Sequence, residues 1–376
     1  MPKNIIICCD GTGNQFGRDN SNVVKLYSVI QKAPGEQIAY YDPGVGTNQP
    51  TGLGLAWKTT FRKIMGLATG YGLYQNIYEA YSYLMENFEP GDQVYLFGFS
   101  RGAYTVRVLS GFIRRLGLLE KGCQNLIPYA FHIYGKTRQK IDPENGKKKL
   151  DNDLANGFRA RFSRKCPIKF IGIWDTVSSI GYFGNWKSYP YTANNSNVET
   201  IRHAIAIDER RAFYAQNKLG RQNWDTDVKE VWFAGVHSDV GGSYSEEESG
   251  LAKIALQWML NEAKVAGLKI DVGQYEKIVL DLKNDGVAGP DAAGKLHKSL
   301  TSFWWIGEII PKTRYDYETG LREWYIPFGA PRRIPEGAFI HQSVLERMAR
   351  SDYRPKALPD KYEAEPLVEN ISSRST

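Results

Sequence analysis

The sequence predicts an α/β fold, a three-layer sandwich in which a mostly parallel central sheet carries helices on both faces. Continuous apolar runs, typical of strands that are buried on both faces, recur as far as residue 236. Segments with apolar residues at helical spacing lie between these runs. Several runs end in short turns rich in glycine or aspartate, where a strand gives way to a helix. Alternation of this kind is typical of a three-layer α/β sheet.

Strands and helices alternate clearly in the first third of the chain. Asn4–Cys9 is apolar throughout, and Tyr71–Phe88 is amphipathic, with Leu73, Ile77 and Leu84 on one stripe. The segment Gly52–Gly70 is rich in glycine and irregular, so no element is predicted there. The predicted elements are strand Asn4–Cys9, helix Ser21–Gln31, strand Gln37–Tyr41, helix Tyr71–Phe88, strand Gln93–Phe97 and helix Ala103–Leu116.

The alternation continues to residue 266 and then weakens. Ser245 and Glu248 have the spacing of a capping box, which predicts a helix that ends at Gly267. The other predicted elements here are helices Cys123–Tyr134 and Asn152–Phe162 and strands Ile168–Trp174, Arg202–Ile207 and Val228–Val236. We therefore expect residues 1–270 to form an α/β core with a helical insertion around residues 118–165. Residues 271–360 are expected to decorate this core, and residues 361–376 to form a tail.

The composition is that of an ordinary globular protein of 376 residues, with 42% hydrophobic and 24% charged side chains. No apolar run approaches the ~20 residues that span a bilayer. The N-terminus leads directly into a core strand and lacks the pattern of a signal peptide, which predicts a cytoplasmic protein. This N-terminus is also compatible with export by a route that reads no N-terminal signal.

Charge and cysteine usage narrow the classes of partner. The net charge is +7, and basic residues gather in Lys136–Lys169. A mild positive charge suits an anionic surface such as phospholipid, although it is equally typical of solvated surface. No nucleic-acid-binding module is recognisable, so no specific nucleic acid is expected. The four cysteines lack C-x-x-C spacing, so no metal, disulfide framework or cofactor is expected.

The strongest functional motif is Gly98-Phe99-Ser100-Arg101-Gly102, between a predicted strand and a predicted helix. G-x-S-x-G alone is a weak signal in a chain with 37 glycines, but this context is the one that a nucleophile elbow requires. Side chains at positions 98 and 102 would collide with each other and with neighbouring elements. The motif therefore predicts that Ser100 is a nucleophile at the N-terminus of a helix.

A serine nucleophile needs a base and an acid that orients the base. Of the five histidines, only His237 directly follows a strong strand, downstream of Ser100 and next to glycines, so it is the candidate base. His341, near the C-terminus, is the alternative base.

Three aspartates are candidates for the acid or a supporting role. Asp175 is favoured because it ends the strand Ile168–Trp174 and fits the chain order serine, acid, histidine. Asp208 ends the next predicted strand and is the alternative acid. Asp239, two residues after His237, is a supporting candidate. Each aspartate also has a structural interpretation as a helix cap or turn former.

The oxyanion of an acyl intermediate needs two backbone donors. The N–H of Arg101 is one candidate, and the loop at Gly11 and Thr12 is the other, with Asp10 orienting that loop. A competing interpretation makes Asp10 the nucleophile of a phosphatase of the haloacid-dehalogenase type. That chemistry uses a second aspartate two residues later, where this sequence has Thr12, so it is disfavoured.

Six motifs occur in an order that resembles the α/β-hydrolase family that includes the first class of type VI secretion lipase effectors. The motifs are Asp10-Gly11-Thr12-Gly13-Asn14, Tyr41-Asp42-Pro43-Gly44-Val45-Gly46, Gly98-Phe99-Ser100-Arg101-Gly102-Ala103, Gly172-Ile173-Trp174-Asp175-Thr176-Val177, Ile207-Asp208-Glu209-Arg210-Arg211 and Gly235-Val236-His237-Ser238-Asp239-Val240-Gly241-Gly242. The similarity runs from about Asn4 to about Pro359. It implies an α/β-hydrolase fold, a serine hydrolase acting on ester bonds with phospholipids as a substrate class, and the triad Ser100, Asp175 and His237.

These observations favour a serine esterase or phospholipase acting on a lipid or a small acyl ester. Peripheral contact with a membrane is compatible with the aromatic segments Tyr182–Tyr191 and Phe303–Trp305, although structural packing explains them equally well. The alternative is a catalytically silent binding or regulatory module on a hydrolase scaffold. The sequence predicts no oligomeric state.

Overall fold

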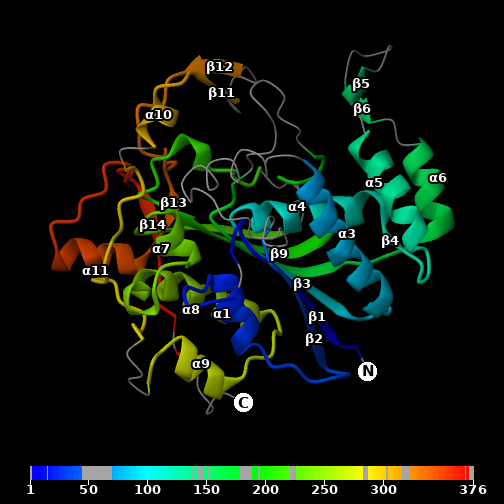
Figure 1. Cartoon of the computed structure of the whole chain (residues 1–376), viewed down its shortest axis with the longest axis horizontal. Coiled ribbons are helices and arrows are strands. Elements are labelled where there is room, and N and C mark those ends of the chain that lie inside the picture. The colour runs from blue at the N-terminus through cyan, green and yellow to red at the C-terminus, as the bar shows by residue number, and fades with distance from the viewer. Residues whose placement is uncertain are drawn as a thin grey trace, which may run out of the picture.

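An eight-stranded parallel sheet runs through the centre of the protein in a computed structural model of the chain (Figure 1). The structure describes residues 2–14, 16–44, 70–136, 139–141, 148–150, 153–177, 189–193, 195–220, 226–282, 287–301, 304–315, 322–368 and 370–371. The glycine-rich segment 52–69, the aromatic residues 182–188 and Phe303 lie outside these residues.

The elements before residue 165 form the first strands, the helices that flank them and the region expected as an insertion. The strands are β1 (Asn4–Cys9), β2 (Gln37–Asp42), β3 (Gln93–Phe99), β4 (Leu118–Leu119), β5 (Gln139–Ile141), β6 (Lys148–Leu150) and β7 (Ser163–Arg164). The helices are α1 (Asn22–Val29), α3 (Gly70–Asn87), α4 (Arg101–Leu116), α5 (Ile127–Gly135) and α6 (Asp153–Phe162).

The remaining elements complete the sheet and add a C-terminal region. The strands are β8 (Ile168–Trp174), β9 (Val198–Ala206), β10 (Asp227–Phe233), β11 (Lys312–Tyr315), β12 (Arg322–Tyr325), β13 (Ala338–His341) and β14 (Tyr362–Glu365). The helices are α7 (His237–Gly241), α8 (Gly250–Val265), α9 (Val272–Ile278), α10 (Trp305–Glu308) and α11 (Gln342–Arg350).

The strand order is β14-β13-β10-β9-β8-β3-β1-β2, and every neighbouring pair is parallel. From β1 the chain first moves outward to β2, then crosses back to β3 and continues in the opposite direction. The loops after β1 and β3 therefore diverge at a topological switch point, where ligands bind in open α/β sheets. Asp10 follows β1 and Ser100 follows β3, so both lie at this point.

The two largest hydrophobic clusters lie on the two faces of the sheet, which confirms the predicted three-layer α/β architecture. Ile5 and Ile7 of β1 join α3 and α4 in one core, whereas Ile6 and Cys8 join α1 and α8 in the other. This alternation follows from the two-residue period of a strand. Figure 1 shows α3 and α4 on one side of the sheet and α1 and α8 on the other.

Most predicted elements agree with the structure to within a few residues. Helix α5 begins at Ile127, four residues after the predicted start at Cys123, and the other exceptions lie in the second half. β9 begins at Val198, four residues before its prediction, and β10 ends at Phe233 because His237 starts the short helix α7. The prediction that Ser245 and Glu248 form a capping box at the start of a helix is wrong, because Glu246–Glu248 is a 3₁₀ turn and α8 begins only after Ser249. The helix does end before Gly267, whose φ of +102 suits glycine.

The prediction of a tail after residue 360 is also wrong, because β14 pairs in parallel with β13 as the edge strand of the central sheet. Each strand has only four residues, and three of the four in β14 are exposed, so neither carries a clear apolar pattern. Glu365 anchors the edge by accepting hydrogen bonds from Trp258 Nε1 and Lys229 Nζ. The sheet is thus completed by residues far beyond residue 270.

In the described residues, no helix has both the length and the apolar character needed to cross a bilayer.

Candidate active site

Ser100 lies at the sharp turn between β3 and α4, with a φ of 57° and a ψ of −118°. A positive φ is rare and strained for a residue other than glycine, and such strain gathers at functional sites. A Cβ on Gly98 would lie 2.5 Å from the carbonyl oxygen of Gly102, and one on Gly102 would lie 2.1 Å from that of Cys9. These contacts confirm why the turn contains two glycines.

His237 and Asp175 meet at the same edge of the sheet. Asp175 follows β8 directly, and His237 is the first residue of α7, which follows β10. The distance from His237 Nδ1 to Asp175 Oδ2 is 2.5 Å, and both side chains are buried. The imidazole is therefore oriented by a carboxylate, and its other nitrogen, Nε2, is left to act as a base.

Further contacts fix the imidazole and the acid. The ring of His237 lies with its centroid 4.6 Å from that of Phe99 and 4.7 Å from that of Tyr214. Phe99 directly precedes Ser100, so the candidate base His237 packs against the turn that carries Ser100. Asp175 Oδ1 accepts a hydrogen bond from the N–H of Ala206 at 3.0 Å.

The electrostatics of the pair favour a charged acid and a neutral base. Burial alone would raise the pKa of Asp175, but the Arg332 guanidinium and then His237 hold it well below its ordinary value. Burial lowers the pKa of His237 below 6.5, and the opposing effect of Asp175 does not fully compensate. Near neutral pH, Asp175 is thus a carboxylate and His237 a neutral imidazole.

Within the described residues, Ser100 Oγ forms no hydrogen bond with His237. Hydrogen bonds between catalytic groups are often long without substrate and tighten when it binds. The backbone of the elbow is firmly held, because the N–H of Ser100 donates to Trp174 O and the N–H of Val177 donates to Ser100 O. Ser100 is thereby tied to the end of β8, from which Asp175 comes.

The loop after β1 lies against the elbow, since a Cβ on Gly11 would meet that of Ser100 at 3.3 Å. The N–H of Gly11, however, donates to Asp10 Oδ1 at 2.6 Å, which argues against its expected role as a donor to the oxyanion. The N–H groups of Thr12 and Arg101 have no hydrogen-bond partner in the part of the chain that the structure describes. These two groups remain the candidates for the oxyanion hole.

Asp10 holds its loop in place. Its carboxylate accepts hydrogen bonds from the hydroxyls of Ser21 and Tyr41, from the side-chain amide of Asn14 and from the N–H of Gly11. Burial raises the pKa of Asp10, and these four donors oppose that shift. A carboxylate with all its lone pairs engaged is poorly suited to attack a phosphorus atom, which further disfavours the phosphatase interpretation.

The other sequence candidates lie in separate networks. Asp208 accepts hydrogen bonds from the N–H of Gly235 and the hydroxyl of Tyr353, and Asp239 pairs with His297. His341 forms a hydrogen bond with Ser343 at the start of α11 and stacks on Phe233. None of the three contacts Asp175 or His237 through a hydrogen bond among the described residues.

The aromatic segments divide between the core and the surface. Tyr189 stacks on Tyr134 within the core beside α4, which is a structural role. Trp304 packs edge-on against Tyr214, the ring that touches His237, whereas Trp305 is 41% exposed. No group of three histidine, cysteine, aspartate or glutamate side chains in the described ranges is arranged to hold a metal ion.

Three residues of the site were not found from the sequence. Arg332 bonds to both carboxylate oxygens of Asp175, and Glu209 accepts a hydrogen bond from the N–H of His237 at 3.2 Å. Arg211 pairs with Glu209, whose pKa it lowers to about 2 against the opposing effect of burial. Glu209 and Arg211 lie in one of the six motifs, which was a usable signal, but no motif surrounds Arg332.

Comparison with known proteins gives one family and several similar proteins. The family model described as the catalytic domain of Tle1-like phospholipase effectors of the type VI secretion system (T6SS) matches residues 3–262. The uncharacterized protein YEL023C of Saccharomyces cerevisiae is 37% identical over 222 residues, which are 57% of this chain but only 32% of that protein.

Two solved structures are similar at 18% identity. One is a crystal structure of an uncharacterized protein from Pseudomonas aeruginosa, with a TM-score of 0.44 over 77% of this chain and 49% of that one. The other is the Tle1 effector bound to the VgrG spike from the type VI secretion system, with a TM-score of 0.34 over 66% of this chain and 52% of that one.

Replacing Gly102 with alanine should destabilise the protein strongly. The new Cβ would lie 2.1 Å from Cys9 O and 2.5 Å from Asp10 O, so α4 would have to move away from the end of β1. We expect a loss of about 2–3 kcal/mol in the free energy of unfolding, measured by urea denaturation. Gly157→Ala in α6 is the matched control, because its Cβ meets only the flexible tip of Arg161, at 3.4 Å. Equal stability of the two variants would contradict the close approach at Gly102.

Proposed function

Since the chain belongs to the family of Tle1-like phospholipase effector catalytic domains, we propose that it is a serine hydrolase that cleaves carboxylic ester bonds in lipids. The observation that carries this proposal is the 2.5 Å contact between His237 and Asp175 beside a strained Ser100. A nucleophile, a base and an orienting acid at one sheet edge are the groups that acyl transfer requires. The family supports the lipid substrate, and the geometry supports the serine mechanism.

In the first half of the proposed reaction, Ser100 Oγ attacks the acyl carbonyl while His237 Nε2 removes its proton. The oxyanion that forms accepts hydrogen bonds from the N–H groups of Thr12 and Arg101. The imidazolium then gives its proton to the leaving alcohol oxygen as the ester bond breaks, which leaves an acyl group on Ser100. Asp175 stays ionised and stabilises the imidazolium throughout.

In the second half, water replaces the alcohol. His237 removes a proton from the water, whose oxygen attacks the acyl carbonyl on Ser100, and the same N–H groups stabilise the second oxyanion. Collapse of this intermediate returns the proton to Ser100 Oγ and releases the fatty acid. The neutral state of His237 near pH 7 suits it to the role of base in both halves.

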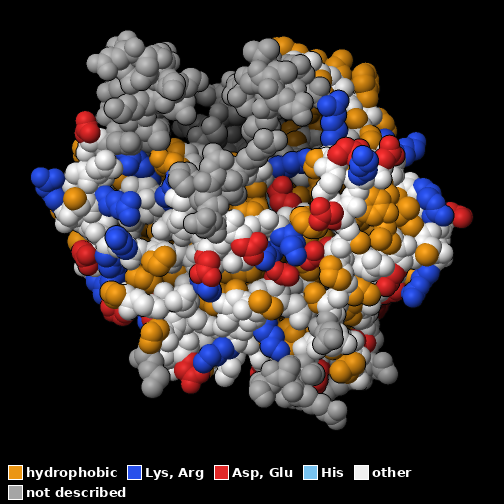
Figure 2. Space-filling view, turned by 180° about the vertical axis from the view of Figure 1, so that it is seen from behind, with side chains coloured by type: hydrophobic (Ala, Val, Ile, Leu, Met, Phe, Trp, Pro, Cys, Tyr) orange, Lys and Arg blue, Asp and Glu red, His pale blue; other side chains and the backbone are white. Residues whose placement is uncertain are grey.

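Access to lipid is a further part of the proposal, because exposed apolar side chains gather above the site. They are Trp305, Ile309, Trp324, Ile326 and Phe328. All come from α10, the β11–β12 hairpin and the residues that directly follow these elements. This region lies at the upper right of Figure 2, where hydrophobic side chains are visible. Tryptophan favours the boundary between lipid and water, so we propose that this surface touches the membrane.

A fluorophosphonate probe tests the nucleophile. We expect its phosphorus to become bonded to Ser100 Oγ with loss of fluoride, as detected by mass spectrometry of the Ser100 peptide. Ester hydrolysis should stop in parallel, and Ser100→Ala should abolish both labelling and turnover. Ser28→Ala is the control, because Ser28 lies on α1 and bonds only to Val24 O among the described residues. A folded protein that leaves Ser100 unlabelled would support a silent binding module instead.

The acid is tested by comparing Asp175→Asn with Asp208→Asn. Asparagine cannot stabilise the imidazolium and disturbs its tautomer, so Asp175→Asn should lower kcat about 10⁴-fold. Asp175 is buried, Asp208 is half-buried and both are hydrogen-bonded, so both variants should unfold at lower urea concentrations, but Asp208→Asn should keep most of its turnover. If Asp208→Asn loses turnover as severely as Asp175→Asn, the acid has been assigned to the wrong residue.

The membrane contact is tested with Trp324→Ala, since Trp324 is 76% exposed. Removing it should weaken binding to phospholipid vesicles about tenfold, through the apolar surface no longer buried, and leave hydrolysis of a soluble short-chain ester unchanged. Val265→Ala is the control, because Val265 is also exposed but lies far from Ser100. It ends α8, and the carbonyl of its neighbour Ala266 accepts a hydrogen bond from Tyr95, near the start of β3, whereas Ser100 follows the end of that strand. An equal loss on vesicles and on the soluble ester would show that Trp324 supports the site and does not contact lipid.

A further inference from the structure

Arg332 is an arginine from the C-terminal region that reaches the acid of the candidate active site. Nη1 bonds to Asp175 Oδ1 and Nη2 bonds to Asp175 Oδ2 at 3.0 Å, while His237 uses the same Oδ2. The two partners are 157 residues apart in the chain, and the Arg332 side chain is only 8% exposed. One carboxylate is therefore shared between an imidazole and a fixed cation.

The guanidinium is held in this position by backbone as well as by charge. Nη1 also donates to Ala206 O at 3.1 Å, and Nη2 donates to Tyr214 O at 2.6 Å. Ala206 ends β9, and Tyr214 is the residue whose ring touches His237. The forked shape of arginine matches this set of four acceptors, which the single ammonium of lysine would not satisfy.

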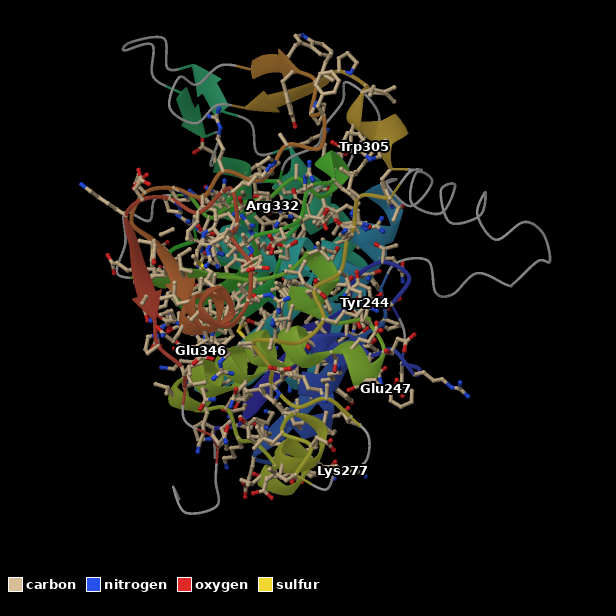
Figure 3. The ribbon with its side chains drawn as sticks, turned by 90° about the vertical axis from the view of Figure 1, so that its left-hand side faces the viewer. Tyr244, Glu247, Lys277, Trp305, Arg332 and Glu346 are labelled. Carbon is tan, nitrogen blue, oxygen red and sulfur yellow. The ribbon has the colours of Figure 1, made fainter. Side chains whose placement is uncertain are left out.

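The segment that carries Arg332 is itself bonded to the loops around the site. Gly329 O accepts a hydrogen bond from Arg210 Nε at 2.6 Å, and Arg333 O accepts one from Lys218 Nζ. Glu308 of α10 links this segment to the site, because it accepts hydrogen bonds from the N–H groups of Gly329 and Ala212. Figure 3 shows Arg332 among the side chains below the level of Trp305.

We propose that Arg332 is a positioning residue for the acid and base, which fixes the Asp175 carboxylate and restrains the basicity of His237. This inference rests on the proposed function. It also extends the catalytic unit beyond the residues 3–262 that the family model matches. The site is then completed by the C-terminal region, which the sequence predicts to be a decoration of the core.

The charged groups that face His237 explain why its basicity is restrained. Asp175 bonds to Nδ1, and Glu209 accepts from the N–H of His237. Arg332 pairs with Asp175 and Arg211 with Glu209, so two negative groups are balanced by two positive ones. Phe99 and Tyr214 contact the imidazole of His237 through their rings. The buried imidazole thus gains little from becoming charged.

Removing Arg332 would leave one negative charge unbalanced beside the imidazole. The charged form of His237 would be stabilised, so its pKa would rise. His237 acts as a base only when neutral, so kcat/KM falls at low pH as the imidazole becomes protonated. This acidic limb of the pH profile of kcat/KM would therefore move to higher pH. A residue that only supports the fold would lower activity without this displacement.

The experiment compares Arg332→Met with the wild type and with Arg333→Met, an exposed neighbouring arginine whose carbonyl, not its side chain, makes the contact with Lys218. The kcat/KM for a soluble ester is measured across pH. Arg332→Met should lower kcat about tenfold or more and raise the acidic limb by about one pH unit, whereas Arg333→Met should match the wild type. An unshifted limb in folded Arg332→Met would overturn the proposal.

Two further variants and one measurement keep the test decisive. Arg332→Lys keeps the charge but not the fork, so its acidic limb should stay near that of the wild type while kcat falls. Arg332→Gln is the neutral substitute if the methionine variant does not fold. NMR titration of the His237 ring in the wild type and in these variants reads its pKa without any turnover. If the wild type hydrolyses no ester, the proposed function fails, and the NMR shift still decides the role of Arg332.

Discussion

The candidate site depends on the hydrogen bonds and ion pair that the buried carboxylate of Asp175 forms. A buried charge is costly unless it is paired and hydrogen-bonded, and Asp175 is bonded to His237, to Arg332 and to the N–H of Ala206. These partners come from α7, from the C-terminal region and from the end of β9. The acid can therefore stay ionised only when the sheet, the helix after β10 and the C-terminal segment are all in place. Formation of the site is in this way coupled to completion of the fold.

The backbone around this carboxylate is strained where the chemistry is proposed to occur. Ser100 and Asp175 both have positive φ values, 57° and 37°, although neither is glycine. The surrounding packing holds them there, because Gly98 and Gly102 let α4 approach the ends of β3 and β1 more closely than any side chain would allow. Strain of this kind persists only where tight packing determines the conformation. The rigid core of the sheet thus holds Ser100 and Asp175, the proposed nucleophile and acid, in positions that flexible loops would not maintain.

Parallel topology explains why residues so far apart in the chain meet. All eight central strands point the same way, so the turns after β1, β3, β8 and β10 open at one edge, and each contributes to the site. Of the exposed tryptophans of the C-terminal region, Trp305 begins α10 directly after Trp304, whose ring contacts Tyr214, and Trp324 lies on the β11–β12 hairpin. This arrangement suits the proposed function, in which the substrate lies in a membrane and acyl transfer takes place at the edge of the sheet.

The sequence by itself determined the three-layer architecture, the six strands of the central sheet that precede residue 236, the elbow at Ser100 and the strand-end positions of Asp175 and His237. Short-range periodicity and the turns that end strands encode these features. Only the tertiary structure decided that Gly11 donates to Asp10, that Asp208 and Asp239 bind other partners, and that Arg332 completes the acid. It also placed β13 and β14 in the sheet, although their four-residue strands carry little pattern. Such pairings join residues that are far apart in the chain, and they depend on how separate elements pack and on which buried groups still need a partner.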